Sequence, residues 1–355
     1  MTTLTSKTIT ALRFPLIVAV VLLHTYIIDR PIGGIVYVPS GKFPGFDWFE
    51  HIYRVELANI SVPLFFFISG FLFFNGLSTF DLRRLGEKLK KRIHSLLFPF
   101  LFWNIAFLLF VAFVHEIAPS LLTSKKSFLE MAPGEVANCF WELSQGLIPL
   151  WFLRDLMIIN LFSPVIFWLL HNKWGKWVMG LLLIVYLSQY YHYLPGLGLR
   201  CSFPYMIGAW FSINGKDLVT ELQKYFWPLT LFFVFVICID CVLWSQHIEV
   251  FAINRLGQIS GVLTIFIWAS KAVAQHLLST RDLYSKGSFF VFVFHMFIIY
   301  IPAKLWVYVM PVNGWTATVA LITIPLLVGY SCLGIYFLLQ RFFPTMTGWM
   351  MGERV

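Results

Sequence analysis

The chain has 355 residues, of which 59% are hydrophobic, 19% aromatic and only 12% charged. Because soluble domains carry charges on roughly 25% of their residues, this composition excludes a soluble globular enzyme and a disordered chain, and it indicates a helix-rich integral membrane protein. The net charge of +9 fits basic cytoplasmic loops. Nucleic-acid binding is not indicated, since no basic stretch alternates with exposed aromatic residues.

The hydrophobic pattern predicts about ten membrane-spanning helices, because about 20 consecutive apolar residues cross a bilayer as a helix. The loops between these segments are too short to form cores of their own. The predicted fold class is therefore all-α, a polytopic membrane helix bundle formed by a single domain over residues 1–355. In chain order, the spans are expected near residues 9–28, 57–79, 95–115, 147–170, 177–194, 199–214, 225–246, 251–270, 287–308 and 316–339.

The distribution of basic residues predicts the orientation, since Lys and Arg collect in cytoplasmic loops. Residues 80–94 carry six basic side chains against two acidic ones and are expected in the cytoplasm. Acidic residues outnumber basic ones in the loops 29–56 and 116–146, which are expected outside. With ten spans, both termini then lie in the cytoplasm. The expected location is the inner (cytoplasmic) membrane, with the chain crossing it many times.

Ionisable side chains inside the spans are costly, and each is a candidate for a functional role. The alternative for each is a pairing with a neighbour or a side chain that reaches the interface. These residues are Arg13, His24, Arg154, Asp155, Arg200, Asp240, Arg255, His295 and Lys304.

Arg13 and His24 stand out because they lie eleven residues apart on the first expected helix, with only apolar residues between them. At about 100° per residue, this separation is three turns plus about 20°, so both side chains share one helical face, about 16 Å apart along the axis. The arrangement suits a long amphipathic substrate whose anionic head pairs with Arg13 while chemistry occurs at His24. The alternative for His24 is a hydrogen bond between helices.

Several motifs follow one another along nearly the whole chain, and together they resemble the acyltransferase-3 family of membrane acyltransferases. The first is the Arg13–His24 pair. The others are residues 59–73 around Ile-Ser-Gly-Phe, 90–103 beginning Lys-Lys-Arg-Ile-His, 149–156 with Trp-Phe-Leu-Arg-Asp, 288–295 ending in His, and the Phe-Phe-Pro of 342–344 with the terminal Gly-Glu-Arg of 352–354.

The resemblance implies a ten-helix bundle that transfers an acyl group, commonly acetyl from acetyl-CoA, to a sugar hydroxyl of a cell-surface polysaccharide or glycolipid. It assigns the essential pair to Arg13 and His24. The family's basic motif at the start of the third helix matches in part. Arg92 stands at its second position but Leu89 at its first, where Lys88, Lys90 or Lys91 could supply the charge.

Acyl transfer from a thioester to a hydroxyl needs a base and a cationic site for the phosphates of CoA. We expect His24 to act as the general base, or as a covalent acyl carrier, because imidazole titrates nearest to neutral pH. The alternative for the basic residues is membrane topology alone, which needs no ligand. The expected donor, acetyl-CoA, would be bound by Arg13, Arg84, Lys88, Lys91 and Arg92.

Four residues are expected to bind substrate: Trp151 and Arg154 at the acceptor entrance, His295 as a second polar group in the cavity, and Ser69. The alternative role is an interface anchor for Trp151, an interhelical hydrogen bond for His295 and close helix packing for Ser69. No metal-ligand spacing is present, so no metal is predicted. The expected partners are acyl-CoA, a sugar or glycolipid acceptor and membrane lipids, without nucleic acid. The sequence leaves the oligomeric state open.

Two other functions compete with acyl transfer. A transporter or flippase for a lipid-linked sugar would also have buried charges and many spans, although no inverted repeat is visible in the sequence. A catalytically inactive relative in a polysaccharide export complex is the third hypothesis, and the presence of both Arg13 and His24 argues against it.

Overall fold

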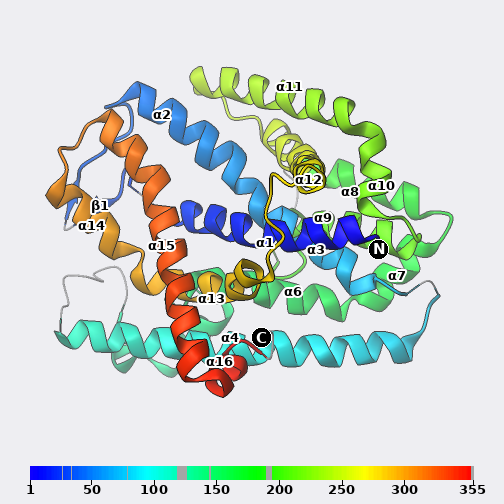
Figure 1. The fold of residues 1–355 in the computed structure, drawn as a ribbon, viewed down its shortest axis with the longest axis horizontal. Helices are drawn as coiled ribbons and strands as arrows, with labels where there is room; N and C mark the ends of the chain where they lie inside the picture. Colours follow the sequence, from blue (N-terminus) through cyan, green and yellow to red (C-terminus); the bar gives the residue numbers. More distant parts are fainter. Residues whose placement is uncertain are drawn as a thin grey trace. The chain divides into compact units, whose positions relative to one another are not determined.

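Helices follow one another along most of the chain in the computed structural model (Figure 1), which describes residues 1–25, 27–32, 34–77, 79–117, 126–143, 145–188 and 194–352. Two residues of the terminal motif, Glu353 and Arg354, lie outside this range. The α-helices are α1 (Thr3–Leu23), α2 (Pro44–Glu50), α3 (Ser61–Phe74), α4 (Leu82–Ile117), α5 (Pro133–Trp141), α6 (Trp151–Leu161), α7 (Ser163–His171), α8 (Gly175–Leu187), α9 (Leu199–Ile213), α10 (Leu218–Leu222), α11 (Phe226–Ser245), α12 (Phe251–Ala274), α13 (Asp282–Ile298), α14 (Tyr300–Val309), α15 (Gly314–Phe342) and α16 (Pro344–Met350).

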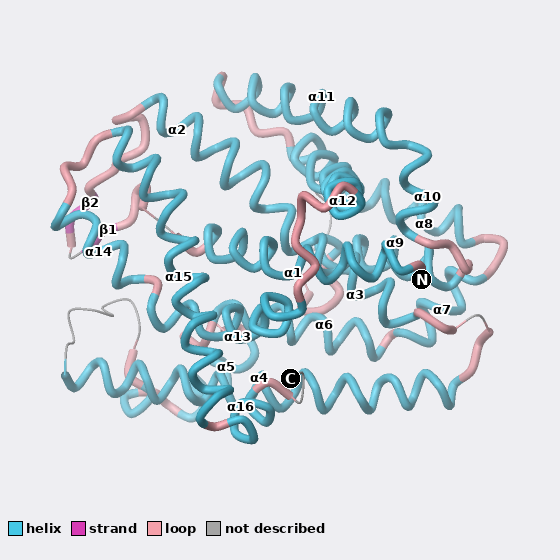
Figure 2. Tube along the Cα trace, viewed as in Figure 1, coloured by secondary structure: helices cyan, strands magenta, loops and turns pink. Residues whose placement is uncertain are grey.

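Shorter elements connect these helices. A π-helix, η1 (His51–Leu57), is followed by the 3-10 helix η2 (Ala58–Ile60), and further 3-10 helices are η4 (Phe128–Glu130), η5 (Ile148–Leu150) and η6 (Gln223–Tyr225). Strands β1 (Pro31–Ile32) and β2 (Ile35–Val36) pair antiparallel, with Pro31 opposite Val36. Figure 2 shows how small this sheet is beside the helices. The all-α prediction is therefore confirmed.

Among the described residues, six helical stretches are long and apolar enough to cross a membrane, so the chain is a multi-pass membrane protein. Two helix pairs add candidates if each pair is one bent span: Ile148–Leu161 with Ser163–His171, bent by 61°, and Asp282–Ile298 with Tyr300–Val309, bent by 52°. The six single stretches are Thr3–Leu23, Pro44–Phe74, Leu82–Ile117, Leu218–Ser245, Phe251–Ala274 and Gly314–Phe342.

The predicted count of ten spans exceeds the six to eight candidates because two expected segments form short helices. Helix α8 has 13 residues and α9 has 15, whereas a bilayer core needs about 20. The count of ten and the cytoplasmic position of both termini stay predictions.

A proline near the start of the second helix explains each bend. Pro164 stands in the first turn of α7 and Pro302 in the first turn of α14. Proline has no N–H, and its ring clashes with the carbonyl of the residue four positions earlier. It is therefore tolerated in the first turn of a helix but interrupts a longer helix.

The chain forms two compact units, each described by itself below. Unit 1 comprises Met1–Leu16, His51–Lys91 and Asp155–Ser285, and unit 2 comprises Ile17–Glu50, Arg92–Arg154 and Lys286–Val355. Each unit therefore uses three separate stretches of the chain. The single domain over residues 1–355 stays a prediction.

Unit 1 is built on the close packing of α3 along α9. A Cβ atom on Gly70 of α3 would overlap the carbonyl oxygen of Tyr205, and one on Gly208 of α9 would overlap the carbonyl oxygen of Phe67. Each glycine thus lets the other helix's backbone approach it, the usual device of membrane helix pairs. Around this crossing, Leu64, Phe67 and Phe266 are completely buried.

Asp217 fastens the beginning of the chain to unit 1. Its carboxylate accepts hydrogen bonds from the Thr2 amide (2.7 Å), the Thr5 hydroxyl (2.7 Å) and the Thr220 amide (3.3 Å), the last of which caps α10. Burial raises the pKa of Asp217, but these hydrogen bonds outweigh it and leave the pKa below its ordinary value. The stabilisation is therefore present above the ordinary pKa of Asp and is lost as the pH falls through the lowered pKa.

Unit 2 is organised around Trp103 of α4. Its ring meets Phe290, Phe294 and Phe297 of α13 edge-on, with centroids 5.6, 6.1 and 6.1 Å away, and its Nε1 donates a hydrogen bond of 3.1 Å to the Met350 carbonyl. These three phenylalanines recur at i, i+4 and i+7, so they form one face of α13. Trp103 thereby fastens both α13 and α16 to α4.

Replacing Gly70 by Ala tests the α3–α9 packing. The added Cβ meets rigid backbone, so we expect the free energy of unfolding to fall by about 1–3 kcal/mol, the usual cost of overpacking. The measurement is the thermal unfolding midpoint of the purified protein in detergent. Gly334→Ala in α15 is the matched control, because nothing lies within 4 Å of its added Cβ and Ala is favoured over Gly within helices by about 0.8–1.0 kcal/mol. Equal midpoints for both variants would contradict the packing argument.

Candidate functional site

Two histidines expected separately from the sequence come together in unit 2. His24 follows the last residue of α1, with its amide bonded to the Val21 and Val20 carbonyls (3.0 and 3.3 Å), so the chain is still helical there. Its imidazole lies beside that of His295 on α13, with ring centroids 5.3 Å apart and ring planes inclined by 40°. His24 is half-buried and His295 is completely buried.

The hydrogen bonding of His295 defines which ring nitrogen carries the proton. Its Nδ1 lies 3.0 Å from the Val291 carbonyl oxygen, which can only accept, so Nδ1 must be the donor. In the neutral ring Nε2 then carries the lone pair. Within the described part of the chain this Nε2 is buried without a hydrogen-bond partner. His295 therefore presents a proton acceptor in an apolar surrounding, next to His24.

Helix α13 places His295 on a different face from its aromatic face. Ser288, Phe292 and His295 recur at i, i+4 and i+7 and share one side of the helix. On that side Phe292 meets Phe152 in the first turn of α6, with centroids 5.9 Å apart. The first turn of α6, which carries Trp151 and Arg154, thus packs against the side of α13 on which His295 lies.

Arg13 lies in unit 1, where residues of the same unit hold it in place. Its Nη1 donates a hydrogen bond of 3.0 Å to the Ser285 hydroxyl at the start of α13. The neighbouring Phe14 packs on Tyr284, with ring centroids 5.5 Å apart. Helix α1 runs without a break from Thr3 to Leu23, so Arg13 and His24 lie on one helical path, as the argument for a shared face requires.

The basic residues of 80–94 lie on the first turns of α4. Arg84, Lys88 and Lys91 recur at i, i+4 and i+7 and line one face of the helix, and Arg92 follows directly. Arg84 and Lys91 are exposed, and Arg92 is half-buried. Arg84 Nε lies 3.4 Å from Asp81 Oδ2 in a solvent-exposed ion pair, which contributes little and leaves the guanidinium accessible.

The remaining expected substrate-binding residues have different surroundings. Trp151 is half-buried as the first residue of α6. Arg154 is buried, donates from Nη1 to the Trp141 carbonyl and lies over the Trp141 ring, 5.7 Å from its centroid. Ser69 is half-buried in unit 1, next to Gly70 of the α3–α9 crossing. The structure thus brings His295 to His24 and places Ser69 at a helix contact.

The comparison with family models decides the identity. The model of the acyltransferase-3 family, described as an acyltransferase domain, matches residues 7–340. The chain belongs to this family.

A curated member of similar sequence is the succinoglycan biosynthesis protein ExoH of Rhizobium meliloti (strain 1021). It is 25% identical over 292 residues, which cover 75% of this chain and 72% of that protein. No solved structure matches the chain. The family assignment confirms the resemblance found in the motifs, and it makes this multi-pass membrane protein an acyltransferase.

Lys88, expected to bind the acyl donor of this acyltransferase, also has a structural role. Its Nζ donates to the carbonyl oxygens of Phe73 (2.9 Å) and Asn75 (2.8 Å) at the end of α3. Two of the three ammonium hydrogens are used there. Carbonyls at a helix end lack partners within the helix, so Lys88 stabilises the junction between α3 and α4.

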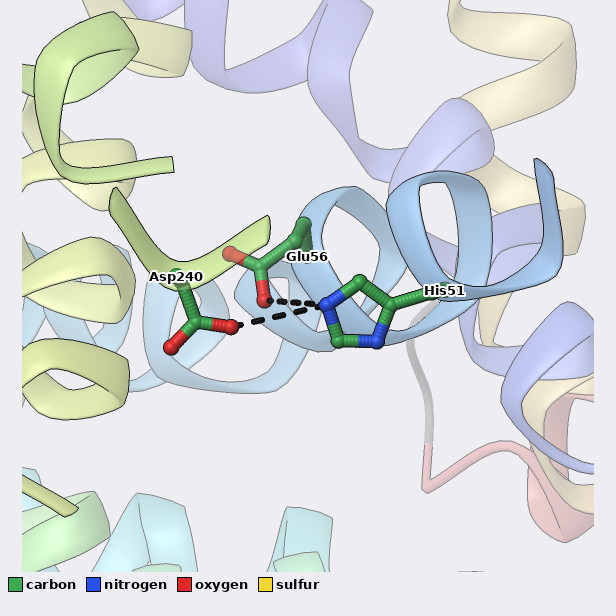
Figure 3. A group of neighbouring side chains, drawn as sticks. All are labelled: His51, Glu56 and Asp240. Carbon is green, nitrogen blue, oxygen red and sulfur yellow. Dashed lines mark ion pairs between the residues drawn. The ribbon is translucent and has the colours of Figure 1, made fainter. Parts of the chain in front are cut away.

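A third group of polar side chains was not recognised as a group in the sequence. His51 and Glu56 of η1 meet Asp240 of α11 (Figure 3), with His51 Nε2 3.5 Å from Asp240 Oδ2 and 3.8 Å from Glu56 Oε1. The sequence marks Asp240 singly, as one of the ionisable residues inside the expected spans that are candidates for a functional role. The signal for the group is weak in the sequence because its two parts are far apart along the chain.

Lys88→Met should lower the free energy of unfolding by about 1.5–3 kcal/mol, because it leaves two carbonyls without their charged donor. The measurement is the thermal midpoint in detergent. Lys90→Met removes the same charge from an exposed position on the same helix and should change stability by less than about 0.5 kcal/mol. A Lys88 variant as stable as the Lys90 variant would show that the two carbonyl contacts contribute nothing.

Proposed function

We propose that the protein is a membrane O-acyltransferase that moves an acyl group, acetyl in the first instance, from acyl-CoA to a sugar hydroxyl of a cell-surface polysaccharide or glycolipid. The observation that carries the proposal is the His24–His295 pair. Two imidazoles with ring centroids 5.3 Å apart, one of them with a buried lone pair on Nε2, form a site that can remove a proton in an apolar surrounding.

His24 is the general base of the proposed reaction. It takes the proton from the acceptor hydroxyl as the oxygen attacks the thioester carbonyl. The new oxygen–carbon bond forms, the carbon–sulfur bond breaks, and the proton passes from His24 to the departing thiolate of CoA. In the variant mechanism, a nitrogen of His24 attacks the thioester, the carbon–sulfur bond breaks, and CoA leaves as the thiol with the proton of the imidazole. The acceptor hydroxyl then attacks the acyl-histidine, the nitrogen–carbon bond breaks, and the hydroxyl proton returns to His24.

His295 holds the acceptor beside His24. Its tautomer is set by the hydrogen bond from Nδ1 to the Val291 carbonyl, so the lone pair of Nε2 is available to accept a hydrogen bond from a substrate hydroxyl. A buried acceptor without a partner is unfavourable, at about 1–3 kcal/mol. A hydroxyl that supplies the missing hydrogen bond recovers this free energy, which favours a substrate with an O–H at this place.

The phosphates of the acyl-CoA donor are bound by the basic face of α4. The exposed Arg84 and Lys91 supply accessible positive charge, and Arg92 follows on the same helix. Arg13, whose Nη1 donates to Ser285, contributes a further positive charge. Lys88 contributes mainly its charge, because most of its donors serve the α3–α4 junction.

The acceptor class is supported by the similarity to a protein named for succinoglycan biosynthesis. We assign Trp151 and Arg154, in the α6 turn that packs on α13, to the acceptor path. An aromatic ring offers a flat apolar face to a sugar, and the guanidinium offers donors to its hydroxyls.

His24→Ala should abolish transfer because it removes the general base. His295→Ala should lower the rate by about 5- to 150-fold, because it removes a hydrogen bond to the acceptor hydroxyl worth about 1–3 kcal/mol. Transfer is measured with radiolabelled acetyl-CoA and membrane glycans as acceptors, and by mass spectrometry of the surface glycans of a deletion strain carrying each variant. His247→Asn, at an exposed position outside the helices, is the control and should keep full activity. Full activity of His24→Ala would refute the mechanism. Transport that depends on an ion gradient, without binding of CoA, would select the transporter instead.

Lys91→Met should raise KM for acyl-CoA several-fold and leave kcat nearly unchanged, because it removes a phosphate contact that is equal in the ground state and the transition state. Steady-state kinetics with purified protein in nanodiscs check this. Lys90→Met is the matched control, since Lys90 projects about 120° away from Arg84 on the same helix. An equal rise of KM in both variants would show that the charge of the loop matters, rather than the face of α4.

A further inference from the structure

We propose that His51, Glu56 and Asp240 form a binding site for a divalent transition-metal ion, of which Zn²⁺ fits best. The three side chains come from two segments far apart along the chain, the π-helix η1 and helix α11. Figure 3 shows that the imidazole edge and both carboxylates point toward one common place. The ligand atoms of the three residues all lie within 4.8 Å of one another.

The π-helix is what brings His51 and Glu56 together. In an α-helix, residues five apart project about 140° from each other and cannot share a ligand. In a π-helix the hydrogen bonds run from i to i+5, so residues five apart lie close to one another. A π-helix costs stability relative to an α-helix and is rare, and such turns are frequently found at functional sites. The π-helical geometry of η1 therefore brings together His51 and Glu56, which an α-helix would hold apart.

The distances suit a metal better than direct hydrogen bonds. His51 Nε2 lies 3.5 Å from Asp240 Oδ2 and 3.8 Å from Glu56 Oε1, beyond the ordinary range of about 2.7–3.2 Å for N–H···O. Tetrahedral Zn²⁺ with bonds of about 2.0–2.1 Å separates its ligand atoms by about 3.4 Å. The observed distances are thus close to those that a bound ion requires, before any adjustment.

Two atoms of the site are buried without partners. In the described part of the chain, His51 Nε2 and Glu56 Oε1 make no hydrogen bond, although the side chains of His51 and Glu56 are only 7% and 4% exposed. An unpartnered buried nitrogen aimed at two carboxylates is costly unless something occupies the space between them. A metal ion accepts the lone pairs of all three atoms at once.

The charge of the cluster favours a dication over a proton on His51. With both carboxylates ionised, as metal binding requires, the cluster carries two negative charges, and an imidazolium alone would leave one of them uncompensated in the interior. A divalent ion with a neutral imidazole brings the total to zero, the condition for charges that are buried at low cost. Imidazole nitrogen and carboxylate oxygen are both ligands of Zn²⁺, and three protein ligands leave its fourth position open.

The surroundings hold the ligands in place. The imidazole of His51 stacks on Trp244 of α11, with centroids 4.3 Å apart and planes inclined by 14°. Gly257 of α12 lies near Glu56, since a Cβ built on it would be 3.7 Å from Glu56 Oε2, an ordinary contact distance. Asp240 is the most exposed ligand, with 13% of its side chain accessible, so an ion would enter the site past Asp240. The bound ion would fasten η1 to α11.

Metal binding is tested on the full-length protein in detergent, purified without chelator and without a histidine tag. We expect about one Zn²⁺ per chain by elemental mass spectrometry, and a rise of the thermal midpoint with added Zn²⁺, since a ligand of the folded state stabilises it. Glu56→Gln and Asp240→Asn should each raise Kd for Zn²⁺ at least tenfold, while Glu249→Gln, an exposed carboxylate just beyond α11, should leave it unchanged.

A measurement on the wild-type protein keeps the test decisive if the variants fail to fold. Co²⁺ should give the intense visible absorption of a four-coordinate ion, and Zn²⁺ should remove it by competition. The absence of bound metal in the wild type, with no shift of its midpoint at millimolar Zn²⁺, would overturn the proposal and leave a proton-sharing cluster. Equal Zn²⁺ affinity in Asp240→Asn and wild type would overturn it as well. Neither readout depends on acyl transfer.

Discussion

The constraint on which the structure depends is that a polar group inside a membrane protein must find its partner within the protein, because lipid supplies none. The chain meets this constraint with side chains that bond to backbone atoms where helices end. Lys88 covers the last carbonyls of α3. The amide of Asn104 donates to the Cys139 carbonyl and accepts from the Leu147 amide, both at 2.9 Å. Arg154 donates to the Trp141 carbonyl. Each of these three connections thus has a polar side chain that stabilises it.

Against this background, the buried polar atoms that lack a partner in the described chain are informative. Nε2 of His295 and Nε2 of His51 are two of them. Other buried side-chain atoms of the described chain, such as the hydroxyls of Ser61 and Ser163, also lack partners, so the position of the two nitrogens is what distinguishes them. The open nitrogen of His295 lies in the site of the proposed chemistry, and that of His51 faces two carboxylates.

The sequence predicted the fold class and the family well because both follow from features that are local along the chain. Long apolar runs such as Leu82–Ile117 identify themselves, and the prolines at 164 and 302 could have signalled the two bends. The sequence was less informative about the number of membrane spans, because an apolar helix can be buried against other helices without crossing the bilayer. Helix α9 has 15 residues and is buried around Gly208 by its contact with α3, so its apolar composition reflects packing in the protein as well as exposure to lipid. The site was predicted residue by residue, but the pairing of His24 with His295 depends on a contact between distant helices, which no spacing reveals.

The π-helix η1 links the three-residue cluster to the spacing of one segment. Because its hydrogen bonds run from i to i+5, η1 keeps His51 and Glu56 together at a spacing of five residues. If the same residues adopted α-helical geometry, the two side chains would project about 140° apart. Removal of one residue from 52–55 would bring them to a spacing of four, at which two side chains share a face of an α-helix. Helix type and residue spacing in this segment must therefore change together if the cluster is to be retained.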